Sequence, residues 1–255
     1  MEKDLSIDLN LKAHLFLTSS TGEFSFENGI ITSKGLFKKN DFENNLKKNW
    51  KDKSKLLYIT ADPESQETNN SIIESFKNNF NTSNLSYNKI DLCDGFKNNQ
   101  NLEEYDVIIL GGGHVPTQNK FFERINLAER IKKFEGLIIG ISAGTMNSAQ
   151  IVYAQPELDG EAIDPKFERF LKGLNLTKFQ ILPHYYSVKD EKLDGLRIIE
   201  DITYEDSVGR CFYILPDGSY IYQTKDECYL YGEGYIIKDK KMTKICEDKN
   251  LFKLY

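Results

Sequence analysis

The sequence predicts an α/β protein built on a mostly parallel β-sheet with helices on both faces. Short apolar runs alternate with helix-like stretches along roughly the first 180 residues, which is the order of elements in a parallel sheet. Two of these runs end in glycine-rich turns, at Gly111 and Gly140, and ligands bind at the carboxyl ends of parallel strands. With 255 residues the chain is long enough for one large α/β domain. We therefore expect a single domain over residues 1–255, with its core at about residues 56–190.

The apolar runs of the first half predict five buried strands, because each is short and continuous. They are His14–Leu17, Leu56–Ile59, Lys89–Leu92, Val107–Leu110 and Gly136–Ile139. Helices are expected between them, near Asn40–Asp52, Asn69–Asn79 and Lys120–Phe134. The stretch Thr145–Tyr153 contains no Gly or Pro and predicts a further helix.

The pattern changes after about residue 178. Lys178–Leu182 predicts one more strand, and Asp190–Asp201 predicts a helix. Four alternating segments follow, joined by turns such as Pro216-Asp217-Gly218, and predict an antiparallel meander. They are Cys211–Leu215, Ser219–Tyr222, Cys228–Tyr231 and Tyr235–Lys238. We expect a C-terminal β extension of the same domain, at about residues 208–246, with a mostly structural role.

Composition excludes several classes of function. The formal net charge is −6, which does not favour binding to nucleic acid or to an anionic membrane. The four cysteines contain no Cys-x-x-Cys pair and the three histidines lie far apart, so no zinc motif is present and free thiols are expected. The first residues lack the pattern of a signal peptide, and no apolar run reaches membrane-spanning length. The sequence thus predicts a soluble cytoplasmic protein without metal or organic cofactor.

The segment Gly140-Ile141-Ser142-Ala143-Gly144 has the pattern of a nucleophile elbow. It follows the apolar run Leu137–Ile139 and leads into the predicted helix. In such a turn the glycines allow the sharp bend, and the serine hydroxyl projects above the sheet. The free N–H groups at the start of the helix can stabilise a developing negative charge beside Ser142.

A second glycine cluster, Gly111-Gly112-Gly113-His114, follows the strand Val107–Leu110. It does not fit a dinucleotide-binding motif, because Pro116 stands where the third glycine would be. It does fit half of an oxyanion hole, with one N–H from Gly113 or Gly112 and the other from Ala143.

A serine nucleophile needs a base, and three histidines are available. His14 opens a strand and is expected to be structural, whereas His114 adjoins the glycine turn and can line the site. His184 follows the strand that ends at Leu182, and this placement makes it the predicted base. A carboxylate should orient its imidazole, and the sequence leaves four acids near equal. These are Glu157, Asp159, Glu161 and Asp164.

The combination of these motifs resembles the dipeptidase E and cyanophycinase family of serine peptidases. The matching pieces are the strand with Gly111–Gly113, the elbow around Ser142, and the strand with Pro183-His184-Tyr185. The resemblance extends over about residues 56–246. It implies the class I glutamine amidotransferase-like fold, a flavodoxin-like three-layer α/β/α sandwich.

The resemblance also implies roles for individual residues. Ser142 corresponds to the nucleophile and His184 to the base. Glu157, fifteen residues after the serine, corresponds to the acid, and Gly113 and Ala143 correspond to the oxyanion hole. The substrate pocket would be bordered by Gly112, His114, Ile141 and Tyr185. Dipeptidase E has Asn and a Trp-like residue where this chain has His114 and Ile141. Arg197 and Arg210 are the candidates for holding the side chain of an N-terminal aspartate. The preferred N-terminal residue of the substrate therefore stays open.

The predicted function is hydrolysis of short peptides from their N-terminal end, with aspartyl dipeptides as one substrate class that the resemblance implies. The predicted partner is a small peptide, without nucleic acid or membrane, and a homodimer is compatible with the sequence. A glutamine amidotransferase would need cysteine in place of Ser142. An α/β-hydrolase esterase would need more than the 42 positions between Ser142 and His184. A non-catalytic binding protein on the same scaffold, or an amidase of another substrate, stays open.

Overall fold

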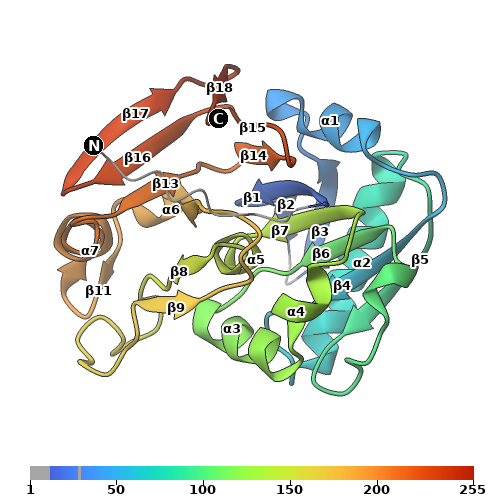
Figure 1. The fold of residues 1–255 in the computed structure, drawn as a ribbon, viewed down its shortest axis with the longest axis horizontal. Helices are drawn as coiled ribbons and strands as arrows, with labels where there is room; N and C mark the ends of the chain where they lie inside the picture. The colour runs from blue at the N-terminus through green and yellow to red at the C-terminus, as the bar shows by residue number, and fades with distance from the viewer. Residues whose placement is uncertain (1–11, 28–29) are drawn as a thin grey trace.

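A large sheet forms the centre of the molecule (Figure 1). The computed structural model describes residues 12–27 and 30–255. In these residues eight strands form the sheet in the order β18-β15-β14-β1-β7-β6-β4-β5. Five neighbouring strands, β1-β7-β6-β4-β5, pair in parallel. On the other side of β1, the strands β14, β15 and β18 pair antiparallel. Their bounds are β1 (His14–Thr18), β4 (Ser54–Ile59), β5 (Tyr87–Cys93), β6 (Val107–Leu110), β7 (Leu137–Ile141), β14 (Tyr220–Gln223), β15 (Cys228–Tyr231) and β18 (Leu251–Lys253).

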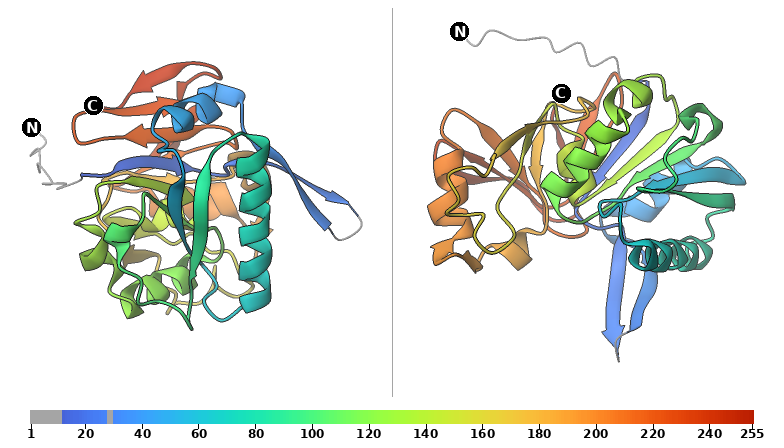
Figure 2. Two further views of the ribbon diagram at one scale, coloured as in Figure 1. Left: turned by 90° about the vertical axis from the view of Figure 1, so that its right-hand side faces the viewer. Right: turned by 90° about the horizontal axis from the view of Figure 1, so that it is seen from below.

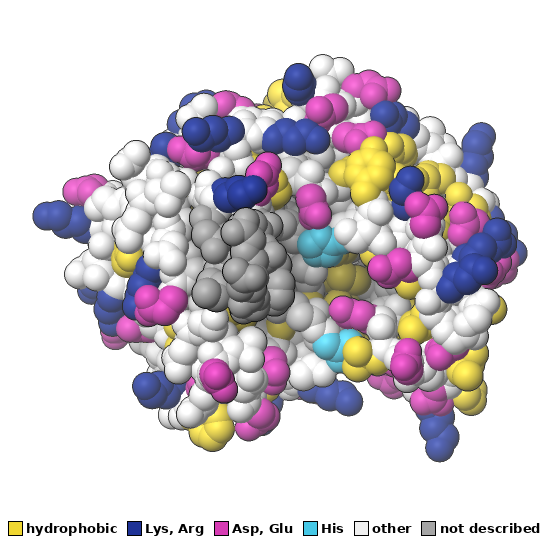
Figure 3. Space-filling model, turned by 180° about the vertical axis from the view of Figure 1, so that it is seen from behind, with side chains coloured by type: hydrophobic (Ala, Val, Ile, Leu, Met, Phe, Trp, Pro, Cys, Tyr) yellow, Lys and Arg dark blue, Asp and Glu magenta, His cyan; other side chains and the backbone are white. Residues whose placement is uncertain are grey.

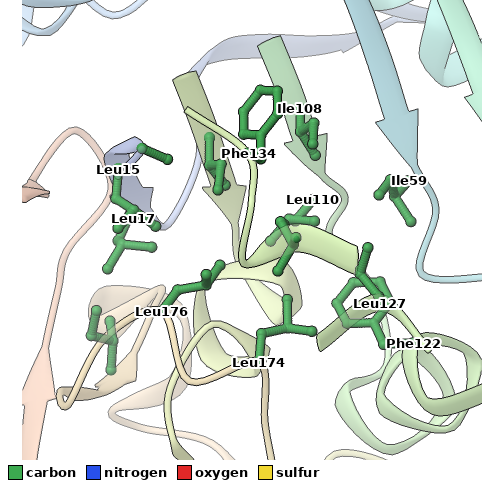
Figure 4. Close-up of a cluster of buried hydrophobic side chains, with 14 of the residues drawn as sticks. Leu15, Leu17, Ile59, Ile108, Leu110, Phe122, Leu127, Phe134, Leu174 and Leu176 are labelled. Atoms are coloured by element: carbon green, nitrogen blue, oxygen red, sulfur yellow. The ribbon is translucent and has the colours of Figure 1, made fainter. Parts of the chain in front are cut away.

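Helices cover both faces of this sheet (Figure 2). They are α1 (Phe42–Lys48) and α2 (Gln66–Thr82) on one face, and α3 (Val115–Arg124) and α4 (Leu127–Ile131) on the other. Alternate residues of each strand supply the two cores: Leu56 and Tyr58 face the first pair of helices, and Leu57 and Ile59 face the second. Figure 4 shows the second core. The predicted α/β/α sandwich with added antiparallel strands is therefore confirmed.

A second sheet packs beside the first. Its order is β10-β13-β16-β17, with bounds β10 (Gln180–Leu182), β13 (Cys211–Ile214), β16 (Gly234–Lys238) and β17 (Lys241–Cys246). β10 and β13 pair in parallel, so their carboxyl ends meet at one edge. Phe212 and Ile237 of this sheet pack with Leu182 and Tyr153 in a shared core. That core joins the second sheet to the elbow region.

Hairpins and short helices complete the fold. The hairpins are β2 (Gly22–Glu27) with β3 (Ile30–Leu36), β8 (Ile151–Tyr153) with β9 (Phe170–Lys172), and β11 (Lys192–Leu193) with β12 (Leu196–Arg197). The first hairpin projects from the body of the molecule (Figure 2). The short helices are η1 (Lys39–Asp41), η2 (Leu102–Glu104), α5 (Ala143–Asn147), α6 (Tyr185–Val188), η3 (Ile198–Thr203) and α7 (Tyr204–Asp206). Within the described residues, no helix has both the length and the apolarity that crossing a bilayer requires.

Two predicted helices are wrong in extent or in kind. The helix after the elbow ends at Asn147, and Ile151–Tyr153 pairs with β9 instead. The tertiary reason is that the Tyr153 ring stacks on Phe212 at 4.3 Å, a partner from another sheet. The expected helix Asp190–Asp201 is mostly the β11–β12 hairpin, followed by the start of the π-helical turn η3. Asp194 and Gly195 have φ values of 53° and 83°, which end a helix and form the tight turn.

Two further expectations need correction. The helix Lys120–Phe134 is divided into α3 and α4 at Asn126, whose φ is 50°. The C-terminal strands do not form one meander, because β13 and β16 join the second sheet while β14 and β15 extend the first. Alternation along a strand identifies a half-buried strand but does not identify its neighbour.

Candidate active site

Ser142 occupies a strained turn between β7 and α5. Its φ of 49° and ψ of −113° are unusual for a residue with a side chain, and such strain collects at functional sites. The flanking glycines are required by space. A Cβ on Gly144 would lie 2.2 Å from the carbonyl oxygen of Leu110, and one on Gly140 would lie 3.0 Å from Thr145 Cα. The sharp bend expected from the sequence is present.

Buried hydrogen bonds fasten the elbow to β1. Thr145 Oγ1 accepts from the N–H of Thr18 at 2.9 Å and donates to its carbonyl oxygen at 2.8 Å. The N–H of Ser142 donates to that same carbonyl oxygen at 3.0 Å. Both threonines are fully buried, so these bonds are shielded from water and fix the turn at Ser142 to β1.

The glycine turn after β6 lies directly beside the elbow. A Cβ on Gly112 would be 3.3 Å from the Cβ of Ser142. The turn is held by the carbonyl oxygen of Gly111, which accepts from Gly144 N–H at 3.0 Å and from Gln118 Nε2 at 2.7 Å. Neither Gly113 N–H nor Ala143 N–H donates to another element in residues 12–27 and 30–255. Their N–H groups are therefore free for the oxyanion role that the sequence predicts.

Ser142 and His184 are both attached to the end of β1. Thr18 accepts the N–H of Ser142, and the following residue, Ser19, accepts the N–H of His184 through its Oγ at 3.2 Å. Ser19 is buried and its hydroxyl donates in turn to the carbonyl oxygen of Leu215 at 2.9 Å. His184 itself has a left-handed backbone, with φ of 57°, and starts α6. Thr18 and Ser19 carry no motif, and the sequence analysis did not identify them.

The carboxylate paired with His184 is that of Asp217. His184 Nδ1 and Asp217 Oδ1 are 2.8 Å apart. The two residues follow β10 and β13, whose parallel pairing aligns Leu182 with Ile214 and so brings the two strand ends together. The side chain of His184 is 33% exposed and that of Asp217 is 45% exposed, so water reaches this pair. In the sequence, Asp217 is distinguished only as part of the turn Pro216-Asp217-Gly218.

Glu157 lies close to the two site histidines without a hydrogen bond to either. The pKa of its carboxyl is raised, mainly by desolvation, while the charges of His114 and His184 oppose that rise. In the part of the chain that the structure describes, its side chain makes no hydrogen bond or ion pair. Glu161 and Glu191 add further negative charge around it.

The other acids and histidines considered from the sequence lie in different places. Glu161 Oε1 pairs with His114 Nε2 at 2.9 Å, which brings both residues into the site. The carboxylate of Asp164 accepts from the backbone of its own loop, and Asp159 is solvent-exposed. His14 bonds the hydroxyl of Tyr222 at 2.7 Å near the start of β1, at the end of the sheet opposite Ser142, so its expected structural role agrees with its position.

The surface around the site is hollowed and largely acidic. Figure 3 shows two histidine side chains on either side of a hollow, with carboxylates and apolar groups around it. Tyr185, predicted for the pocket, packs its ring 4.9 Å from that of Tyr235. A cavity of about 850 Å³ lies elsewhere, at the amino ends of β1 and β7, and includes His14. Among the described residues no group of three or more His, Cys, Asp or Glu side chains is arranged to hold a metal ion.

Comparisons with known proteins give one family and one fold. The model of peptidase family S51 matches residues 30–231, which is more than half of the chain. A protein from Listeria monocytogenes EGD-e, assigned to peptidase E and solved by crystallography, has a similar structure, with a TM-score of 0.56. The two sequences are 16% identical, and the match covers 91% of this chain and 98% of that chain. No curated protein matches the chain.

Proposed function

The chain belongs to peptidase family S51 and is a serine-type peptidase, and from this we propose that it removes residues from the N-terminal end of short peptides through Ser142, His184 and Asp217. The observation that carries the proposal is the double attachment at the end of β1, where Thr18 holds the nucleophile and Ser19 holds the base. A strained serine and a histidine that contacts a carboxylate, attached to adjacent residues of one strand end, are the groups that acyl transfer needs.

The proposed mechanism uses an acyl-enzyme. Ser142 Oγ attacks the scissile carbonyl carbon while His184 Nε2 takes the hydroxyl proton. The N–H groups of Gly113 and Ala143 bind the resulting oxyanion, and Asp217 stabilises the imidazolium through Nδ1. His184 then donates its proton to the leaving amine, and water cleaves the ester by the same route.

Two acids compete for the orienting role, and the contacts favour Asp217. The residue chosen from the family resemblance, Glu157, makes no hydrogen bond to His184, whereas Asp217 lies 2.8 Å from Nδ1. Glu157 fits the substrate pocket better, because its carboxylate lies near both site histidines without an ion pair or hydrogen bond to any described residue and can bind the ammonium group of a peptide.

The same charges argue against a preference for N-terminal aspartate. Both candidate arginines are engaged elsewhere: Arg197 pairs with Asp201 at 2.5 Å, and Arg210 lies over the ring of Phe170 at 3.8 Å. The carboxylates around Glu157 repel an anionic side chain. We propose that peptides with a neutral or cationic first residue are the better substrates.

The test is hydrolysis of a dipeptide library that varies the first residue, measured by mass spectrometry, together with labelling by a fluorophosphonate probe. Wild type should cleave and be labelled, Ser142→Ala should do neither, and Ser71→Ala, which alters an exposed serine on α2, should match wild type. Cleavage confined to Asp-X peptides would overturn the specificity. Cleavage by Ser142→Ala at the wild-type rate would overturn the mechanism.

A further inference from the structure

The loop of residues 154–169 between β8 and β9 is clamped to the active site by one carboxylate. Oε1 of Glu161 pairs with His114 Nε2 at 2.9 Å. Its other oxygen, Oε2, accepts the backbone N–H groups of Glu157 at 2.9 Å and Leu158 at 3.0 Å. One largely buried side chain, 15% exposed, therefore ties the loop to itself and to a neighbouring element.

His114 is the fixed end of this clamp. Its Nδ1 contacts Thr117 Oγ1 at 2.8 Å, so both ring nitrogens are engaged. It is the residue that follows the proposed oxyanion donor Gly113 and precedes α3. The position of the loop is thus coupled to the turn beside Ser142.

A second carboxylate holds the same segment from its other side. Asp194, at the tip of the β11–β12 hairpin, accepts from Gly160 N–H at 2.8 Å and from Ala162 N–H at 3.0 Å. Four backbone N–H groups within residues 157–162 therefore point at two carboxylates. Residues 157–162 are thus held from two sides, although they contain no helix or strand.

We propose that Glu161 and His114 form a latch that positions residues 157–162, and with them the Glu157 carboxylate, as one wall of the peptide-binding site. Glu161 is a positioning residue rather than a catalytic residue, because it acts through the loop and through His114. That the loop binds a peptide rests on the proposed function. That Glu161 and His114 hold the loop rests on the hydrogen bonds alone. Without the latch, the loop becomes ordered only when substrate binds. The free energy needed to order it weakens substrate binding and leaves the rate of the chemical step unchanged.

Hydrogen exchange tests the latch without reference to activity. Glu161→Gln and Glu161→Ala should accelerate exchange of the amides of Glu157 and Leu158, with Ala the stronger, because the acceptor of these two amides is weakened or lost. Glu168→Gln is the matched control, since it removes one charge from an exposed position of the same loop and should leave those amides unchanged. Unchanged exchange in Glu161→Ala would overturn the latch.

Kinetics test its role. In Glu161→Gln, KM for a cleaved dipeptide should rise by about tenfold with kcat nearly unchanged, as expected for a lost charge-assisted hydrogen bond that acts on binding. Labelling of Ser142 by a small fluorophosphonate should keep its wild-type rate. A fall in kcat and in the labelling rate with unchanged KM would overturn the assignment of Glu161 as a positioning residue for substrate binding. If wild type neither cleaves peptides nor is labelled, the proposed function fails, and accelerated exchange would still support the latch.

Discussion

Replacement of Asp217 by Ala tests which acid serves His184. The change removes the carboxylate that, among the residues the structure describes, is the only one at hydrogen-bond distance from the imidazole, at 2.8 Å from Nδ1. A charge-assisted hydrogen bond contributes about 1.5–3 kcal/mol, and the exposure of both side chains favours the lower half of that range. At 1.4 kcal/mol for each factor of ten, about 2 kcal/mol corresponds to a fall of about 30-fold in kcat/KM. Loss of a buried triad acid costs about 10⁴-fold, so the expected effect is clearly smaller.

The assay is kcat and KM for one cleaved dipeptide, with the fluorophosphonate labelling rate beside it. Asp217→Ala should lower kcat and labelling together, because both depend on His184 taking the Ser142 proton. Glu157→Gln should act mainly on KM. Asp226→Ala, which removes an exposed carboxylate from another turn, is the control and should match wild type. The reasoning is refuted if Asp217→Ala keeps the wild-type kcat while Glu157→Gln loses the larger factor.

Three further predictions concern stability and thiol reactivity. Thr145→Val should lower the free energy of unfolding by about 1–3 kcal/mol in urea denaturation, because it leaves the buried N–H of Thr18 without an acceptor, while the carbonyl oxygen of Thr18 keeps the N–H of Ser142; Thr243→Val, at an exposed position, should change it little, and equal effects would contradict the argument. Glu157→Gln should stabilise the fold at neutral pH, because the raised pKa means that the carboxylate costs stability once it is ionised. That gain should disappear at acid pH, where the carboxyl is protonated in both states, and a gain that persists there would contradict the assignment. Burial raises the pKa values of the Cys93 and Cys228 thiols to about 12, so both should resist a disulfide reagent at mildly alkaline pH until urea unfolds the protein; rapid reaction of either thiol in the native state would refute this.

The elements recognised from the sequence are those whose signal is local. The five parallel strands have short apolar runs that need no partner to be identified, and the elbow around Ser142 depends on two glycines whose neighbours leave no room for a side chain. The predicted helix that starts at Thr145 is too long. Residues Ile151–Tyr153 form a strand because Tyr153 stacks on the Phe212 ring, and local propensity does not reveal that contact. The hairpin at Asp194 differs, because its signal is local. The Asp194-Gly195 pair is typical of a hairpin turn and contradicts the predicted helix Asp190–Asp201.

The contact between Asp217 and His184 depends on which strands are neighbours. Asp217 was visible in the Pro-Asp-Gly turn after a correctly predicted strand, but the meander interpretation separated it from His184. Only the parallel pairing of β10 with β13 brings the two strand ends together. The sequence distance of 33 residues carries no information about that contact.

The sequence by itself determined the α/β class, the position of the sharp turn at Ser142, and the place of Ser142 and His184 after the strands that precede them. These follow from backbone sterics and from apolar periodicity, which act over a few residues. The tertiary structure alone decided that Thr18 and Ser19 join Ser142 to His184, that Asp217 contacts the imidazole, and that Glu161 holds His114. Each of these contacts joins segments far apart in the chain, and their meeting depends on strand order and register, which no local pattern encodes.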